Sequence, residues 1–190
     1  TQTLFSLLID ADKSQVGVKN DAFFAQRNHL PDDAVEKYAG SIVRPPSPLN
    51  ELRNRAFQEV LQHKIDLQHR IYMLTLPTGL GKTLNSLAFA LKLRNKVHEQ
   101  SAGRILPRII YSLPFLSIID QNFREFENVF RANGISLDSS ILLKHHQLSE
   151  VAFEKHNNGN DAGLNEWDFD TSASKLLIEG WNSEVVVTTF

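Results

Sequence analysis

One stretch decides the fold of this chain: Leu76-Pro77-Thr78-Gly79-Leu80-Gly81-Lys82-Thr83. An apolar run over 71–76 precedes it and an amphipathic run over 84–93 follows it, so we predict a strand, a glycine turn and a helix. Two glycines let the backbone turn tightly and direct successive N–H groups inward, and the helix adds the positive end of its dipole. The stretch therefore predicts a loop that binds a polyphosphate.

Lys82 and Thr83 are the candidate catalytic residues of this loop. Lys82 would reach the β- and γ-phosphates of ATP as a point charge, and the Thr83 hydroxyl would ligate the Mg²⁺ that bridges them. The general pattern has a glycine five residues before Gly81, where this chain has Leu76 followed by Pro77; the Pro-Thr-Gly-x-Gly-Lys-Thr form is typical of helicase motors. The alternative is a glycine turn followed by an ordinary surface lysine. We expect the nucleotide to contact Pro77, Thr78, Gly79, Leu80, Gly81, Lys82 and Thr83.

Composition narrows the class of protein. The 190 residues include 20 Lys and Arg against 22 Asp and Glu, so no overall positive charge attracts nucleic acid, and any such binding depends on local geometry. The chain has no cysteine, and no apolar run approaches the roughly 18 residues of a membrane helix, so we expect a cytoplasmic protein without a membrane partner. It begins at Thr1 and ends at Phe190 directly after an apolar run, which leads us to expect a piece of a longer protein.

Strands and helices alternate after the loop. We predict strands over 108–113, 141–143 and 184–189, and after Pro114 a helix whose phenylalanine-rich stripe packs into the core. This order predicts an α/β fold with a parallel sheet flanked by helices and a ligand at the carboxyl ends of the strands. Asn95-Lys96-Val97-His98 begins like a guanine-reading motif but ends in histidine, so we predict a loop there and adenine as the base.

The start of the helix after Pro114 is a candidate nucleic-acid contact. Free N–H groups and Ser117 at a helix N-terminus can hold a backbone phosphate, although a simple capped helix is an equal alternative. Thr188 and Thr189 end the last predicted strand, where strand ends carry function in open parallel sheets.

The chain before the loop divides into three parts. Residues 1–12 predict a helix, on which Asp10 and Asp12 lie about 200° apart, so only one of them can be a metal ligand. Asp12 shares the apolar face; the alternative is a solvent-exposed carboxylate. A proline-rich segment over 44–48 follows, and a helix is predicted from Leu49 to about His63. On that helix Arg53 and Gln58 are candidate adenine contacts, with exposed polar side chains as the favoured alternative.

Three blocks resemble the first three motifs of a superfamily-two helicase, in order and at suitable spacing: 77–83, 112–121 and 185–189. Together with Leu52-Arg53-Asn54 and residues 4–13, the sequences of these blocks resemble the CRISPR-associated helicase-nuclease family of type I systems. The resemblance implies that 1–20 end an HD-type nuclease domain, that 21–48 are a linker and that 49–190 are most of a first RecA-like P-loop domain.

The resemblance also implies a function. The family uses ATP and Mg²⁺ to move along single-stranded DNA after a crRNA-guided surveillance complex has opened the target, and it cuts DNA with a divalent transition metal. Asp12 matches the last metal ligand of the HD domain, and Ser117, Gln121, Thr188 and Thr189 fall in blocks that contact DNA. No strand-terminal acid pair follows Lys82, so we expect the chain alone to bind nucleotide without turning it over. The alternatives are another class of P-loop ATPase, such as a kinase or transporter subunit, or a non-catalytic binding module.

Overall fold

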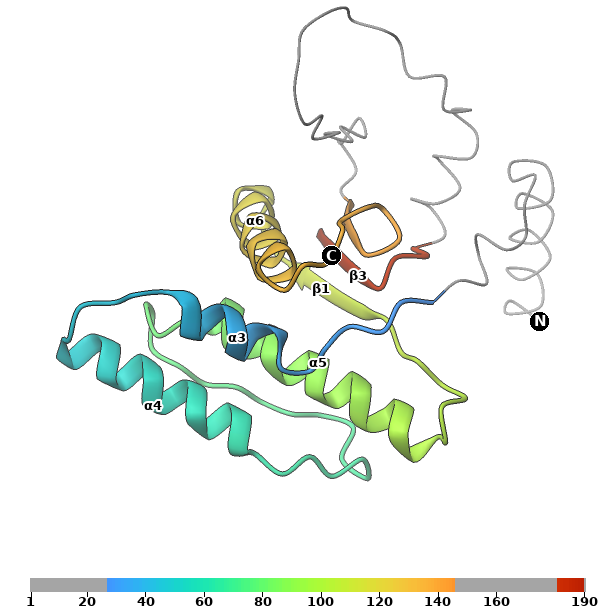
Figure 1. The fold of residues 1–190 in the computed structure, drawn as a ribbon, viewed down its shortest axis with the longest axis horizontal. Helices are drawn as coiled ribbons and strands as arrows, with labels where there is room; N and C mark the ends of the chain where they lie inside the picture. The colour runs from blue at the N-terminus through green and yellow to red at the C-terminus, as the bar shows by residue number, and fades with distance from the viewer. Residues whose placement is uncertain (1–26, 146–180, 190) are drawn as a thin grey trace, which may run out of the picture.

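The fold was obtained as a computed structural model that describes residues 27–145 and 181–189. The predictions for the segment over 1–20, with Asp10 and Asp12, fall outside these residues. The described part contains four helices and three strands (Figure 1).

The helices begin and end where the sequence supplies termini. Ser47 accepts a hydrogen bond from the backbone N–H of Asn50 and so caps the N-terminus of α4, with Pro48 in the first turn. Beyond Asn133, Gly134 adopts a φ of 70° after the last turn of α6. The four helices are α3 (Ala34–Ser41), α4 (Pro48–Gln62), α5 (Lys82–Gln100) and α6 (Leu116–Ala132).

The strands form a parallel sheet, as the alternating pattern predicts. They are β1 (Ile109–Leu113), β2 (Leu142–His145) and β3 (Val185–Thr189), in the order β1-β3-β2. β3 is the central strand: Val185 lies opposite Ile109 on one side and opposite Leu142 on the other. The two crossovers place the carboxyl ends of all three strands at one edge of the sheet.

The core lies where α5 and α6 meet the sheet. Val185 and Val187 are fully buried and join Ile109 and Leu142 in one apolar cluster with these helices. Residues 30–35 pack into the same cluster, and α3 contacts both α5 and α6 (Figure 1). Each buried aliphatic side chain contributes about 1.5–3 kcal/mol. The helical members of the cluster are Leu87, Ala88, Leu91, Ile119, Phe126, Val129 and Phe130.

Three local predictions were wrong. Residues 71–76 form no strand. They pair with no strand among the described residues, and Ile71 and Met73 are 85% and 89% exposed. Apolar character favours a strand but does not supply the neighbour with which it pairs. Residues 95–100 are helical rather than a loop, because the Asn95 amide is buried and donates to the Leu30 carbonyl. We predicted that the phenylalanine-rich stripe begins at Phe115, but Phe115 precedes α6 and is 63% exposed, so it does not belong to the buried stripe.

Within residues 27–145 and 181–189, no helix has both the length and the apolar character required to cross a bilayer.

Candidate functional site

The phosphate loop has the backbone that its glycines predict. Gly79 and Gly81 adopt φ values of 88° and 79°, in the left-handed region that other residues avoid. A Cβ atom at Gly79 would meet nothing within 4 Å, and one at Gly81 would only touch the Asn85 amide at 3.6 Å. The need for glycine therefore comes from the backbone conformation and not from crowding.

The N-terminus of α5 is suited to an anion. Gly81 stands at the N-cap, so no side chain caps this helix, whereas Ser47 caps α4. The first N–H groups of α5 thus keep their capacity to donate, and the helix dipole adds positive potential. Lys82 is exposed at this end and forms no ion pair with another described residue. The donor set fits the phosphates of a nucleotide.

Two side chains donate hydrogen bonds to carbonyl groups of the loop. The Asn85 amide is buried and donates to the carbonyls of Leu80, at 3.2 Å, and Gly81, at 2.9 Å. Arg53 on α4 donates from Nε to the Gly79 carbonyl at 2.7 Å. Arg53, a candidate adenine contact in the sequence, therefore contacts the loop backbone, whereas Gln58 is exposed on α4. Asn85 was not identified as a loop contact from the sequence. Its position four residues after Gly81, one helical turn away, could have indicated this contact.

The Thr83 hydroxyl is already oriented by the protein. It donates to Oδ1 of Asn122 on α6 over 2.7 Å. Asn122 is 4% exposed, and its own amide nitrogen donates to the Ile118 carbonyl at 2.7 Å. Thr83 itself is half-buried in the first turn of α5. A hydroxyl oxygen beside phosphate-binding N–H groups fits Mg²⁺, which prefers oxygen ligands.

The four candidate nucleic-acid residues lie at the carboxyl-end edge of the sheet. Ser117 and Gln121 are exposed on the first turns of α6, which follows β1. Thr188 and Thr189 pair in register with the last two residues of β1. Thr188 is only 3% exposed and donates to the Thr189 carbonyl, with His145 Nδ1 at 3.3 Å. Ser117 and Gln121 are therefore accessible in this conformation, whereas the Thr188 hydroxyl is used internally.

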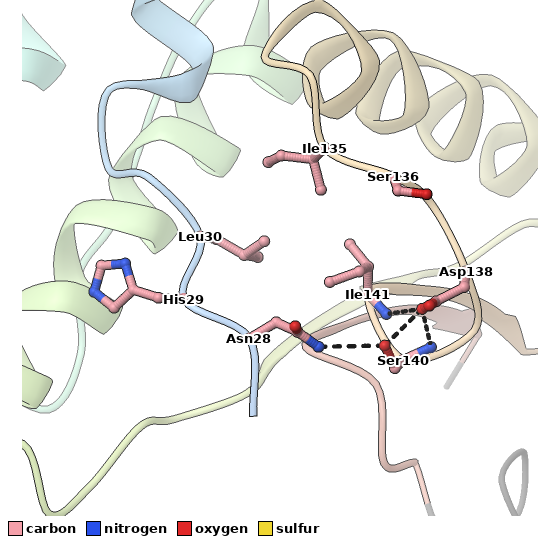
Figure 2. A pocket seen from close by; sticks show the side chains of 8 residues that line it. All are labelled: Asn28, His29, Leu30, Ile135, Ser136, Asp138, Ser140 and Ile141. Carbon is pink, nitrogen blue, oxygen red and sulfur yellow. Dashed lines mark hydrogen bonds between the residues drawn. The ribbon is translucent and has the colours of Figure 1, made fainter. Parts of the chain in front are cut away.

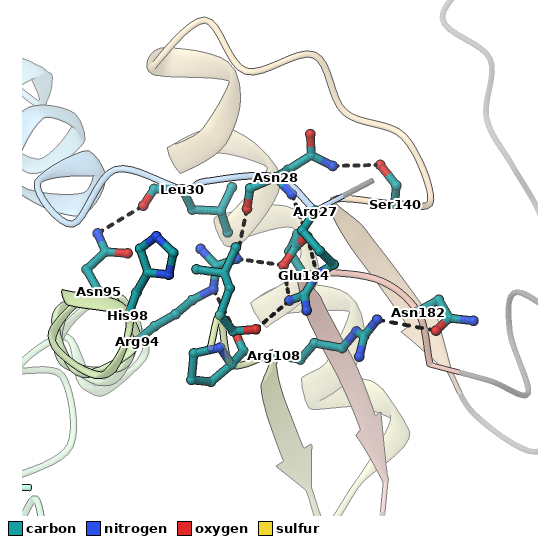
Figure 3. Close-up of polar contacts among 12 residues, drawn as sticks. Arg27, Asn28, Leu30, Arg94, Asn95, His98, Arg108, Ser140, Asn182 and Glu184 are labelled. Atoms are coloured by element: carbon teal, nitrogen blue, oxygen red, sulfur yellow. Dashed lines mark hydrogen bonds and ion pairs between the residues drawn. The ribbon is translucent and has the colours of Figure 1, made fainter. Parts of the chain in front are cut away.

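A buried ion cluster lies at the opposite edge of the sheet (Figure 3). Glu184, just before β3, accepts from Arg94 Nη2 at 2.6 Å and from Arg27 Nη2 at 2.7 Å. The backbone N–H of Asn28 donates to the same carboxylate at 2.7 Å. The sequence patterns missed this cluster because its members lie up to 157 residues apart.

Opposing effects set the pKa values in the cluster. Burial alone would raise the pKa of Glu184, but hydrogen bonds from Arg27 and the Asn28 N–H, with the charges of Arg27 and Arg94, lower it below its ordinary range. Burial lowers the pKa of Arg94, against the attraction of Glu184. The cluster fixes the 27–30 segment to α5 and to the sheet, and the hydrogen bonds between its described members do not involve the phosphate loop.

A cavity of about 350 Å³ opens between the 28–30 segment and the connection from α6 to β2 (Figure 2). Its carboxylate, Asp138, accepts hydrogen bonds from the backbone N–H groups of Ser140 and Ile141. Within the described part of the chain, no group of three or more histidine, cysteine, aspartate or glutamate residues could hold a metal. The cavity lies at the amino end of β2, away from Thr83.

Comparison with known proteins identifies the family of this chain. Residues 47–167, more than half of the chain, match the family described as "type III restriction enzyme, res subunit". The chain belongs to this family. The res-subunit match begins at the cap of α4 and includes the phosphate loop, α5, β1, α6 and β2.

A curated relative of this chain is also found. It is named "CRISPR-associated nuclease/helicase Cas3", from Haloferax volcanii, and is 32% identical over 197 aligned positions. The alignment covers 95% of this chain and 20% of the relative, so the chain spans about a fifth of the relative's length. No solved structure matches the chain.

Proposed function

We propose that this chain is the nucleotide-binding part of an ATP-dependent motor that moves along single-stranded nucleic acid. The observation that carries the proposal is the loop over 77–83, which ends in an α5 N-terminus without a side-chain cap. Membership of the res-subunit family and the similarity to a protein named as a helicase support it.

The residues divide the work of holding Mg²⁺ and ATP. The backbone N–H groups of 81–84 would donate hydrogen bonds to the phosphates at the positive end of the helix dipole. The Lys82 ammonium would add a charged donor. Arg53 and Asn85 donate to carbonyls of the loop and so hold the backbone that carries these N–H groups. Thr83 would supply an oxygen to Mg²⁺, and the cation would neutralise part of the charge of the phosphates.

Nucleic acid would follow the carboxyl-end edge of the sheet. The α6 N-terminus with Ser117 and Gln121 offers exposed donors to a backbone phosphate. Such contacts read the backbone and not the bases, as a motor that moves along any sequence requires. Thr189 is half-buried at the same edge, and Thr188 would need a local rearrangement before its hydroxyl could reach a ligand.

We propose CRISPR antiviral defence as the setting, with single-stranded DNA as the track and a crRNA-guided surveillance complex as the partner. The name of the Haloferax volcanii relative supports this setting. The proposal extends to a metal-dependent DNA nuclease in the same protein, with Asp12 as a ligand of a divalent transition metal. Asp12 lies outside the described residues, so its support is the sequence alone.

Two binding measurements on the purified chain test the proposal. Labelled ATP with Mg²⁺ is titrated against GTP as competitor, and we expect ATP to be preferred. A labelled single-stranded oligonucleotide is then titrated with wild type, Ser117→Ala and Gln121→Ala, with Asn128→Ala on an exposed part of the same helix as control. Weaker binding in the first two variants alone supports the DNA contact. Binding of neither ATP nor oligonucleotide would instead favour a non-catalytic module.

A further inference from the structure

The contact between Thr83 and Asn122 joins the phosphate loop to α6. Thr83 is the second residue of α5, and Asn122 lies in the second turn of α6, 39 residues later. Nothing in the known nucleotide-binding pattern of the loop requires this partner. The asparagine is nonetheless almost completely buried, with both ends of its amide engaged.

The hydrogen bonds fix which end of the amide faces Thr83. The amide nitrogen of Asn122 donates to the Ile118 carbonyl, so the amide oxygen must face Thr83. Reversing the amide would place two carbonyl oxygens together at 2.7 Å and leave the nitrogen without that acceptor. Asn122 is therefore an acceptor for the Thr83 proton.

The direction of that proton matters for a metal ligand. A hydroxyl has one hydrogen and two lone pairs, and only a lone pair can bind Mg²⁺. A hydrogen that pointed toward the cation would oppose binding, and a freely rotating hydroxyl would lose entropy on binding. An acceptor on the opposite side removes both costs in advance.

We propose that Asn122 is a positioning residue for Mg²⁺: it holds the Thr83 hydroxyl with its lone pairs directed to the phosphate loop. This inference rests on the proposed nucleotide-binding function. Gln121, the neighbour of Asn122, is exposed on the outer side of the same turn. The helix that carries the proposed nucleic-acid contacts thus also orients the metal ligand.

The test measures the affinity of the purified chain for ATP in EDTA and at increasing Mg²⁺. We expect Asn122→Ala to reduce the magnesium-dependent increase in ATP affinity roughly fivefold, the equivalent of one ordinary hydrogen bond, with ATP affinity in EDTA unchanged. Because the affinity in EDTA is measured on the same sample, an unchanged value shows that the alanine variant is folded.

Two controls separate positioning from simple loss of stability. Asn133→Ala removes another partly buried asparagine from the far end of α6, where its amide donates to the carbonyls of Ala34 and Val129 at 2.8 Å each. It should leave the magnesium dependence intact. Thr83→Val removes the hydroxyl, and in that background Asn122→Ala should have no further effect, as a double-mutant cycle requires.

Three results would overturn the inference. They are a full magnesium-dependent increase in Asn122→Ala, an equal loss of ATP affinity with and without Mg²⁺, and a further loss when Asn122→Ala is added to Thr83→Val. Absence of any ATP binding by the wild-type chain would reject the proposed function itself, and the inference with it. A failure of the inference alone leaves ATP binding by the wild-type chain intact, so the two failures are distinguishable.

Discussion

Replacing Glu184 by glutamine should destabilise the fold strongly, because the change removes a charge that two arginines share. Glu184 is 1% exposed and accepts four hydrogen bonds, two from Arg27 at 3.0 and 2.7 Å, one from the Asn28 N–H at 2.7 Å and one from Arg94 at 2.6 Å. An amide presents an N–H₂ group to some of these donors and leaves Arg94 charged, buried and without a counter-ion.

The magnitude follows from the burial of each partner. Breaking a buried pair by removing one partner costs about 3–5 kcal/mol. Arg94 is almost fully buried, but the Arg27 side chain is 27% exposed, so water can solvate part of its charge. We therefore expect the lower end, about 3 kcal/mol, which corresponds to a fall in Tm of about 6–12 °C for a domain of this size.

Urea denaturation followed by circular dichroism measures the effect on the free energy of unfolding. The matched control is Asp120→Asn, which removes the carboxylate of an exposed pair with Lys144 at 3.1 Å. That change should cost less than about 1 kcal/mol. If Glu184→Gln were no more destabilising than the control, the ion cluster would not anchor the 27–30 segment.

Three further predictions concern the loop and the ion cluster. Arg53→Ala should weaken ATP binding roughly fivefold by releasing the Gly79 carbonyl, whereas Arg55→Ala, which breaks an exposed pair on the same helix, should not; a fluorescent-nucleotide titration checks both. Gly81→Ala should cost about 1–2 kcal/mol because φ is 79°, whereas Gly40→Ala in α3 should be neutral or stabilising, as thermal unfolding would show. The lowered pKa of Glu184 means that its carboxylate stabilises the fold above the unfolded-state pKa of roughly 4.3 and that this stabilisation is lost as the pH falls through the lower folded-state value. The stability difference between wild type and Glu184→Gln should therefore shrink in acid, and a constant difference would contradict the assignment.

Local patterns predicted the features that depend on neighbouring residues. The glycines at 79 and 81 specify the loop backbone, the run over 108–113 gives β1, and Pro114 separates this strand from α6. Each of these results from the conformational preferences of a few consecutive residues. The parallel sheet follows from their alternation.

Features that depend on distant residues were not predictable in this way. The run over 71–76 has the composition of a strand, but strand formation depends on a partner that composition does not specify. The bond between Thr83 and Asn122 joins residues 39 apart, and the pair of Glu184 with Arg94 joins residues 90 apart. Only the packing of α5 against α6 and of both against the sheet brings these side chains together.

The most direct test of the central claim is isothermal titration of the purified chain with Mg²⁺ and ATP, comparing wild type, Lys82→Ala and Lys64→Ala. Lys64 is another exposed lysine, outside the loop, so its removal changes the net charge by the same amount. We expect saturable binding by wild type and Lys64→Ala, and at least a tenfold loss in Lys82→Ala, since a hydrogen bond to a charged group is worth roughly 1.5–3 kcal/mol. Equal affinity in all three proteins, or no binding by the wild type, would contradict a working phosphate loop.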